Sequence, residues 1–449
     1  MITFDNVLDE TCDSILQWNG KEHLNSVTII RDVFGKISLL LDNSEILKEE
    51  SESLSVQLEQ RLNNFFSKKI YLKKLSRKHQ KEAERTKIII EMIESERKEW
   101  KSEEGIIFYI SERPIAKKAW VKQTSLQNGV WPYEKAVEEN GTKVVTFYSF
   151  KGGMGRTTAL AGTALALVNQ GFNVLMLDTD IEAPGLATLF FDENVVERGV
   201  LDYLLEHPLA PERNVREYIL DVTDPVLLNE KDGNLYLMPA GKVDEYYLQK
   251  LARIDYQDHR EGYLEGALKG MLNAIRDNYA VDYILIDARA GFHDMGGIVV
   301  SQIPHGAILF GNNSRQSWDG MTQVLRTIAE GHNADWPILI VDSMCEKPTS
   351  ANYAKLKSEF MEKAYTVCME YYYDSSRPLP GIGADGVAHS PEFVSFDDAL
   401  LHGVKLFSSG NAEQDEVAKA YKELIAGTYP TAASYKRIAG RIKGWFGEE

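Results

Sequence analysis

The sequence predicts an α/β protein with a mostly parallel sheet and helices on both faces, preceded by a small α+β module. A β-rich apolar run at residues 144–148 stops at a glycine cluster, and an alanine- and leucine-rich helical stretch follows it. Further along, short and nearly all-apolar runs alternate with helical stretches, which is typical of a parallel sheet that is covered on both faces. Residues 1–140 lack this alternation and form a separate region.

Length and composition indicate a soluble protein of two to three domains. The chain has 449 residues, of which 44% are hydrophobic and 26% are charged, as in ordinary globular proteins. It contains no apolar run of about 18 residues, so we expect no membrane-spanning helix. The first residues, Met1–Asn6, lack a basic region followed by an apolar core, so no secretion signal is expected. Three widely spaced cysteines indicate reduced thiols in the cytoplasm.

The net charge of −17 argues against nucleic-acid binding by the whole surface. A local exception is the stretch Lys68–Lys87, which contains nine lysine or arginine residues against Glu82 and Glu84. A solvated helix face is the favoured interpretation of this stretch, and a basic surface that binds nucleic acid stays open.

The N-terminal region, residues 1–122, is predicted to be an α+β module that contacts a protein partner. Its strand-like runs are Val27–Arg31, Ile37–Leu41 and Ile106–Ile110. The first two are close enough in sequence to form a hairpin. A charged stretch from Ser51 to Lys101 is predicted to be helical, with a break near Leu75–Ser76. Residues 123–142 include Gly129 and Pro132 and few apolar repeats, so they are predicted to be a linker.

Residues 143–428 carry the alternating pattern. The predicted strands are Val144–Tyr148, Val174–Leu177, Leu235–Met238, Tyr283–Ile286, Ala307–Phe310 and Ile338–Val341. The helical stretches include Thr157–Asn169, which Gly171 ends, and Leu264–Asp277. In such a sheet, ligands bind beyond the carboxyl ends of the strands. The glycine cluster, Asp178 and Asp287 all follow strands directly, so we expect them at one common edge.

The glycine cluster has the layout of a phosphate-binding loop. Gly152, Gly153 and Gly155 allow backbone N–H groups to surround phosphate oxygens, because no Cβ blocks the approach. The helix that follows adds the positive end of its dipole, and Thr157 stands where a hydroxyl would bind a nucleotide-held Mg²⁺. The predicted nucleotide-binding residues of this loop are Gly152, Gly153, Met154, Gly155, Arg156, Thr157 and Thr158. The common pattern G-x-x-x-x-G-K-[ST] is altered at Phe150 and Arg156, which replace its first glycine and its lysine.

The run Lys151–Thr157 resembles the deviant Walker A loop of the ParA/MinD family of P-loop ATPases. The resemblance implies ATP and Mg²⁺ as ligands. It also implies a catalytic role for Lys151, which in that family contacts phosphates, commonly across a dimer that encloses the nucleotide. Arg156 departs from the family lysine. It can still pair with phosphate through two N–H groups, but its planar shape leaves the rate of hydrolysis open.

Two acidic segments resemble the switches of that family. Asp287 ends a buried strand, as the Walker B acid does, and is predicted to hold Mg²⁺. Ala288–Gly291 resembles the second switch, with Arg289 in place of a proline; an ion pair with an acidic neighbour is favoured over contact with nucleotide or a partner. Asp178–Gly185 resembles the first switch. Asp180 is the first choice, and Asp178 the second, for positioning Mg²⁺ or the attacking water; helix capping is the alternative.

Base recognition is inferred from the resemblance alone. In the family, a late loop containing a proline closes over adenine. The best match is His389–Glu392, with Pro391 as the predicted contact. Ser343, which follows the strand Ile338–Val341, is a second candidate.

The last segment, residues 429–449, is predicted to be a basic amphipathic tail. Apolar residues recur at helical spacing among basic ones, at Tyr435, Ile438, Ile442 and Trp445. This resembles the terminal helix with which MinD-type ATPases touch membranes, which would place the protein at the membrane periphery. Gly440 and Gly444 weaken such a helix. A final helix packed on the protein or on a partner is the favoured alternative.

Together these features predict an ATP-dependent molecular switch that binds Mg-ATP and hydrolyses it slowly. We expect a homodimer, or a partner protein, to close over the nucleotide. The altered loop also resembles a subgroup found in multi-gene bacterial systems, including defence-type operons, which implies a role in antiviral defence. Two alternatives stay open: a non-hydrolysing nucleotide-binding scaffold, and an ATPase that positions membranes or DNA.

Overall fold

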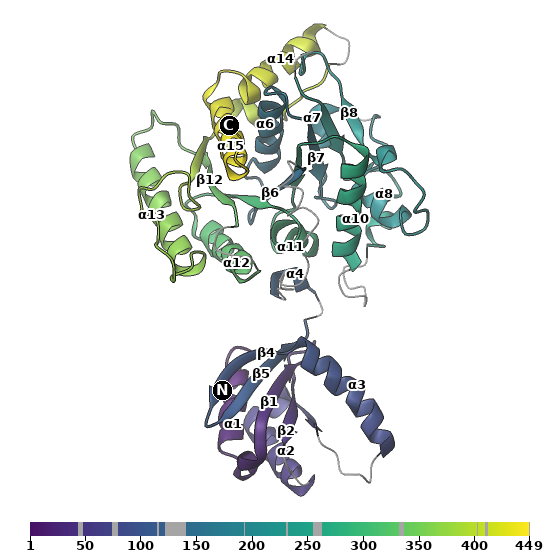
Figure 1. The fold of residues 1–449 in the computed structure, drawn as a ribbon. Helices are drawn as coiled ribbons and strands as arrows, with labels where there is room; N and C mark the ends of the chain where they lie inside the picture. Colours follow the sequence, from purple (N-terminus) through teal and green to yellow (C-terminus); the bar gives the residue numbers. More distant parts are fainter. Residues whose placement is uncertain are drawn as a thin grey trace. The chain divides into compact units, whose positions relative to one another are not determined.

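The chain divides into two compact units, Met1–Ile115 and Ala116–Glu449, in a computed structural model (Figure 1). The structure describes residues 1–43, 48–73, 80–114, 116–121, 141–192, 194–229, 232–254, 263–331, 336–401, 403–408 and 412–448. The predicted linker at 123–142 therefore lies almost wholly outside the described residues. The predicted module 1–122 extends beyond the first unit, because Lys118–Val121 packs within the second.

The first unit is built on a five-stranded sheet with the order β3-β2-β1-β5-β4. Its strands are β1 (Leu24–Arg31), β2 (Ile37–Asn43), β3 (Phe66–Leu72), β4 (Lys98–Glu103) and β5 (Ile106–Glu112). β1 and β2 form the predicted antiparallel hairpin, and β1 pairs with β5 in parallel. The helices are α1 (Val7–Leu16), α2 (Lys48–Leu62) and α3 (Gln80–Glu96), with 3₁₀ turns at Asn19–His23 and Asn63–Phe65.

Both faces of this sheet are covered. Side chains of α1 and α2, among them Ile15, Leu54 and Leu58, pack on one face with Val27 and Ile29. Ile90 and Ile93 of α3 pack on the other face, against Ile30 and Leu40. The alternation of the β1 side chains between the two clusters is the period of two expected for a strand.

The stretch Ser51–Lys101 is not the interrupted helix that the sequence predicts. α2 ends at Leu62, Asn63 adopts a left-handed φ of 50°, and β3 follows as an edge strand. The predicted break near Leu75–Ser76 lies outside the described residues, as do several members of the basic stretch. Some of the described basic side chains pair with acids: Lys68 with Glu59 at 3.1 Å, and Lys73 with Glu94 at 2.7 Å.

The second unit confirms the predicted α/β architecture. Its eight strands have the order β13-β12-β11-β6-β10-β7-β9-β8, and every neighbouring pair is parallel except β8 with β9. The strands are β6 (Lys143–Ser149), β7 (Val174–Asp178), β8 (Leu220–Val222), β9 (Leu235–Met238), β10 (Tyr283–Asp287), β11 (Gly306–Gly311), β12 (Ile338–Cys345) and β13 (Glu392–Ser395). The strand that leads into the glycine loop, β6, is central.

Helices cover both faces of this sheet (Figure 1). One face carries α4 (Lys118–Val121), α8 (Val200–Glu206), α10 (Tyr263–Asn278), α11 (Asp294–Ser301), α12 (Arg315–Gly331) and α13 (Tyr353–Tyr371). The other carries α6 (Arg156–Val168), α7 (Ala187–Phe190), α14 (Ala412–Ala426) and α15 (Pro430–Trp445). The remaining short elements are α9 (Tyr247–Leu251) and 3₁₀ turns at Val215–Tyr218 and Asp398–Leu400. Because both faces are buried, apolar residues predominate in the central strands.

The C-terminal segment is a packed helix and not a free amphipathic one. Tyr435, Ile438 and Ile442 of α15 are at most 2% exposed and pack in the core that α6 and α14 share. Gly162 of α6 lies directly under Tyr435. The apolar face that would enter a lipid surface is therefore already used, and the favoured alternative, a final helix packed on the protein, is what the structure has.

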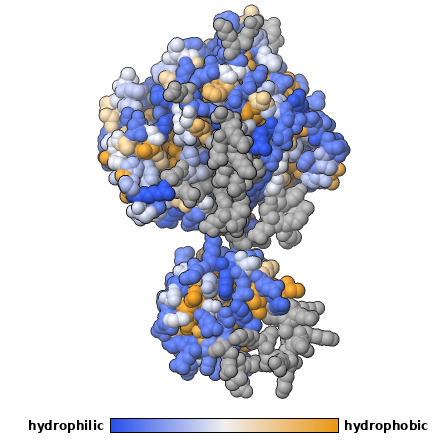
Figure 2. Space-filling model, in the orientation of Figure 1, coloured by the Kyte–Doolittle hydropathy of each residue, from blue (hydrophilic) through white to orange (hydrophobic). Residues whose placement is uncertain are grey.

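Within the described residues, none of the helices is both long and apolar enough to span a bilayer. On the visible face of the molecule, apolar side chains lie scattered among hydrophilic ones (Figure 2).

Candidate functional site

The glycine loop joins the end of β6 to the start of α6. Gly153 and Gly155 have φ angles of 73° and 64°, which residues other than glycine rarely adopt. A Cβ at Gly153 would meet no atom within 4 Å, so the space beside this residue is open. Gly155 caps α6, and its carbonyl accepts the first helical hydrogen bond from Ala159 at 2.9 Å. The loop therefore presents free N–H groups and a helix N-terminus to the same space.

A residue of β12 contacts the backbone of the loop. The hydroxyl of Ser343 donates to the carbonyl oxygen of Met154 at 2.5 Å, and both residues are buried. Lys151, at the start of the loop, is exposed. The loop thus combines a buried contact at Met154 with an exposed cation at Lys151.

Asp287 is where the predicted site residues converge. It ends β10, is 1% exposed and lies opposite Asp178 in the register of β10 and β7. One carboxylate oxygen accepts from the hydroxyl of Thr157 at 2.6 Å, and the other accepts from Nε of Arg156. The parallel strands thus bring the acid and the start of α6 together, as the sequence predicts for residues that follow neighbouring strands.

Arg156 also reaches the first switch segment. Its Nη2 donates to Oδ2 of Asp180 at 3.3 Å. Burial disfavours the charged guanidinium, but the attraction of Asp287 and Asp180 outweighs it and raises the pKa of Arg156. The side chain predicted to bind phosphate therefore neutralises two carboxylates that are predicted to serve Mg²⁺.

Asp178 and Asp180 have different surroundings. Asp178 accepts backbone N–H groups from Asp180, Gly185 and Leu186 at 3.0, 3.3 and 3.1 Å, so it folds the segment back on itself. Burial, reinforced by the charge of Asp287, raises the pKa of Asp178 to about 8. Burial also raises the pKa of Asp180, with Arg156 opposing the shift. Asp180 thus contacts the side chain of Arg156, whereas Asp178 binds backbone N–H groups of its own segment.

The residues fit a magnesium ion only together with phosphate oxygens. Among the described residues there is no group of three or more His, Cys, Asp or Glu side chains that could hold a metal. The oxygens of Thr157 and Asp287 are the hard ligands that Mg²⁺ prefers, and this ion commonly combines one or two protein oxygens with substrate phosphates.

A second ion cluster links the two switch segments. Glu182 forms an ion pair with Arg289, and its second carboxylate oxygen contacts Nε2 of His293. Burial lowers the pKa of His293, and Glu182 opposes this shift. The favoured expectation for Arg289, an acidic neighbour, matches this contact. Glu182 and His293 were not predicted, because nothing in the sequence links residues this far apart.

Beside the loop lies a small cavity of about 70 Å³, lined by Gly155, Thr158, Ser343, Phe396, Asp397 and other residues. Ser343, the second candidate for base recognition, is part of it. Pro391 precedes β13, whereas Phe396 and Asp397 follow it, so Pro391 lies at the far end of this strand from the cavity.

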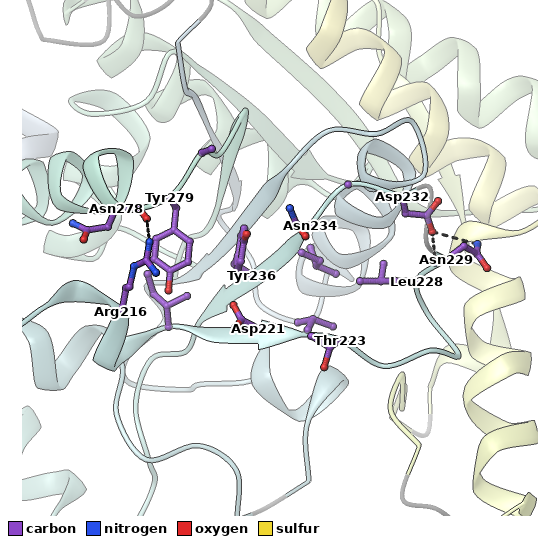
Figure 3. A pocket seen from close by; sticks show the side chains of 15 residues that line it. Arg216, Asp221, Thr223, Leu228, Asn229, Asp232, Asn234, Tyr236, Asn278 and Tyr279 are labelled. Atoms are coloured by element: carbon purple, nitrogen blue, oxygen red, sulfur yellow. Dashed lines mark hydrogen bonds between the residues drawn. The ribbon is translucent and has the colours of Figure 1, made fainter.

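The larger cavity, of about 670 Å³, belongs to a different place (Figure 3). It lies around the edge strand β8 and the residues that precede β9 and β10, at the end of the sheet away from the glycine loop. Among its lining residues, Arg216 donates to the carbonyl of Asn278 at 2.5 Å, and Tyr236 packs edge-on against Tyr279. None of the predicted site residues lies there.

Comparison with known proteins gives the second unit a set of relatives. Residues 142–334 match a protein-family model described as an AAA domain. An uncharacterized ATP-binding protein of Methanocaldococcus jannaschii is 31% identical over 150 residues, covering 33% of this chain and 46% of the relative. A putative septum site-determining protein MinD of Guillardia theta is 26% identical over 159 residues, covering 34% and 49%. The chain spans about half the length of the curated relatives it matches.

Solved structures with a similar arrangement include two ATPases. The cell division ATPase MinD of Pyrococcus furiosus has a TM-score of 0.41 and 21% identity, covering 67% of this chain and 98% of that one. A ParA family ATPase of Chlorobium tepidum has a TM-score of 0.42 and 17% identity over the same shares.

Proposed function

From the premise that residues 142–334 form a P-loop ATPase domain of the ParA/MinD type, we propose that the protein is an ATP-dependent molecular switch. It binds Mg-ATP at the loop Lys151–Thr158, hydrolyses it slowly, and passes the nucleotide state to a partner. The single observation that carries this proposal is the cluster in which Thr157 and Arg156, at the start of α6 after the glycine loop, contact Asp287, and Arg156 also contacts Asp180.

Each residue of the cluster has a task in phosphoryl transfer. The N–H groups of Gly152–Gly155 bind phosphate oxygens, and Thr157 with Asp287 hold the metal. Magnesium, when bound, neutralises charge on the transferring phosphate. Asp180 orients the attacking water once Arg156 leaves it for phosphate. Lys151, which is exposed, reaches phosphates held by a second copy of the chain.

A second candidate function rests on Arg156 itself. Its guanidinium pairs with two carboxylates at once, those of Asp180 and Asp287. If the guanidinium moved to phosphate, the two carboxylates would lose their partner and repel each other. This cost favours a scaffold that binds nucleotide and does not turn it over. In either case, we propose that the first unit contacts a partner protein. The resemblance of the loop supports a role in a multi-component bacterial system such as antiviral defence.

Calorimetry and phosphate release test the proposal on the full chain. We expect heat on addition of ATP with Mg²⁺, and slow phosphate release in the wild type. Asp180→Ala should keep ATP binding and lower the release rate by about 100-fold, because it removes the group that orients water. Arg156→Lys should release phosphate faster than the wild type if the arginine limits turnover.

Two results would contradict the proposal. Folded protein that gives no heat with ATP and Mg²⁺ would rule out the nucleotide site. Phosphate release that is equal in Asp180→Ala and the wild type would rule out the catalytic assignment. Binding without any release, in the wild type as in Arg156→Lys, would favour the scaffold.

A further inference from the structure

A short segment at the start of the second unit is fastened to the helix that follows the second switch. The backbone N–H of Lys117 donates to Oδ1 of Asp294 at 2.5 Å, and its Nζ donates to Oδ2 at 2.8 Å. The indole N–H of Trp120 donates to the carbonyl of His293 at 2.7 Å. Asp294 begins α11, so both contacts reach the first turn of that helix or the residue before it.

Packing reinforces these hydrogen bonds. The ring of Trp120 lies edge-on to Phe292, with centroids 5.2 Å apart, and is 8% exposed. A Cβ at Gly297 of α11 would lie 2.8 Å from Ala119 and 2.9 Å from Trp120, so only glycine allows this approach. The segment Lys117–Val121 is therefore seated on α11 by shape as well as by polar contacts.

The residues it holds are continuous with the second switch. Phe292, His293 and Asp294 directly follow Ala288–Gly291. Trp120 also packs on Tyr148, whose hydroxyl donates to the carbonyl of Gly291 at 3.1 Å. His293 in turn pairs with Glu182 of the first switch segment. A displacement of Gly291–Asp294 would therefore disturb contacts that reach both switches and the segment.

The other end of the segment is close, along the chain, to a fixed point of the first unit. The N–H of Arg113 donates to the carbonyl of Arg31 at 3.0 Å, which extends the pairing of β5 with β1. Only residues 114–116 separate Arg113 from Lys117. Four residue steps span at most about 14 Å, so the stretch of chain between the two attachment points is short.

We infer that Lys117 and Trp120 are positioning residues for the second switch, and that they couple the nucleotide site to the first unit. The inference rests on the proposed function, because it needs a nucleotide that moves Gly291–Asp294. Binding at the glycine loop then shifts α11 and the segment Lys117–Val121, and the first unit responds. By linkage, a change in this segment also changes the affinity for nucleotide.

Hydrogen–deuterium exchange on the full chain, with and without Mg-ATP, tests the coupling. In the wild type we expect ATP to change exchange at residues 288–297, at 117–121 and in β5. Lys117→Gln removes the charged contact with Asp294 and should keep the change at 288–297 while the change in β5 is lost. Its ATP affinity should differ from that of the wild type by about 5-fold or more.

Lys118→Gln is the matched control, because the contacts with Asp294 belong to Lys117. It should behave as the wild type. Trp120→Phe keeps a ring on Phe292 and loses the hydrogen bond to His293, so it should weaken the β5 response without unfolding the unit. ATP binding that leaves 117–121 and β5 unchanged in the wild type overturns this inference alone. A Lys117→Gln protein that matches Lys118→Gln also overturns it. Calorimetry without any ATP binding overturns the proposed function and this inference with it.

Discussion

At the scale of single residues, the arginine at position 156 changes what the loop can do. A lysine would offer one compact charge, whereas the planar guanidinium contacts Asp287 through Nε and Asp180 through Nη2. These contacts hold Asp180 of the first switch segment beside the end of β10. A phosphate that binds as we propose would compete with two buried carboxylates for this side chain, which is the physical reason for the slow turnover that we propose.

Asp342 supplies a prediction about pH at the same scale. It lies in β12, is 4% exposed, and burial raises its pKa to about 7. Its pKa in the unfolded chain is about 4, so between about pH 4 and 7 the folded chain binds more protons than the unfolded chain. Asp342 therefore lowers the free energy of unfolding as pH rises, by at most about 1.4 kcal/mol per pH unit.

Asp342→Asn removes this ionisation. The free energy of unfolding, measured with urea at pH 5 and pH 8, should be higher for the variant relative to the wild type at pH 8 than at pH 5. The reason is that the wild type carries a buried charge at pH 8. Asp319→Asn, at a side chain that is 68% exposed, should show no such difference. An equal gap between variant and wild type at the two pH values would refute the assignment.

At the scale of elements, the loop depends on α12 as well as on its own glycines. Phe150, which replaces the first glycine of the common pattern, packs on Phe292 with centroids 4.9 Å apart and on Gly320 of α12. A methyl carbon at Gly320 would lie 2.0 Å from Cγ of Phe150. The side chain of Phe150 at the start of the loop thus fits only because α12 has a glycine, Gly320, at the point of contact.

Gly320→Ala should force Phe150 out of its position, cost about 1–3 kcal/mol of stability and weaken ATP binding. Gly270→Ala is the matched control in α10, where a Cβ meets nothing within 4 Å; it should stabilise the unit by about 0.5–1 kcal/mol. Urea unfolding and calorimetry with ATP measure the two effects. Equal behaviour of the two variants would show that the contact with Phe150 does not constrain the loop.

At the scale of the whole molecule, Glu448 links the starts of two central strands of the sheet. Glu448 contacts Nζ of Lys143 at the start of β6, at 2.5 Å, and the hydroxyl of Tyr283 at the start of β10. The side chain of Lys143 is only 4% exposed. The first residues of the two central strands thus both contact the carboxylate of Glu448, which lies three residues after the end of α15.

Glu448→Ala should lower the free energy of unfolding by about 1–3 kcal/mol, because it leaves the buried ammonium of Lys143 without its partner. The partial exposure of Glu448 reduces this loss. Adding Lys143→Met should restore part of this loss. Glu416→Ala, at a side chain that is 75% exposed, should stay within about 0.5 kcal/mol of the wild type. Urea unfolding decides, and additive losses in the double variant would contradict the pairing.

Local patterns in the sequence determined the glycine loop, the strand before it, the helix after it, and the acids that end β7 and β10. These features depend on residues that are neighbours along the chain, through φ preferences, helix capping and the period of two in strands. They sufficed to predict the parallel sheet and the edge at which Asp178, Asp287 and Thr157 meet.

The tertiary structure alone decided which side chains meet across that edge. The contacts of Arg156 with Asp180 and Asp287 join positions 24 and 131 residues apart, and Lys117 meets Asp294 across 177 residues. Such contacts follow from the strand order β6-β10-β7 and from the seating of α4 on α11, which depend on how the whole core packs. The edge strand β3 was missed for the same reason: a strand with polar residues forms there only because β2, more than twenty residues away, pairs with it.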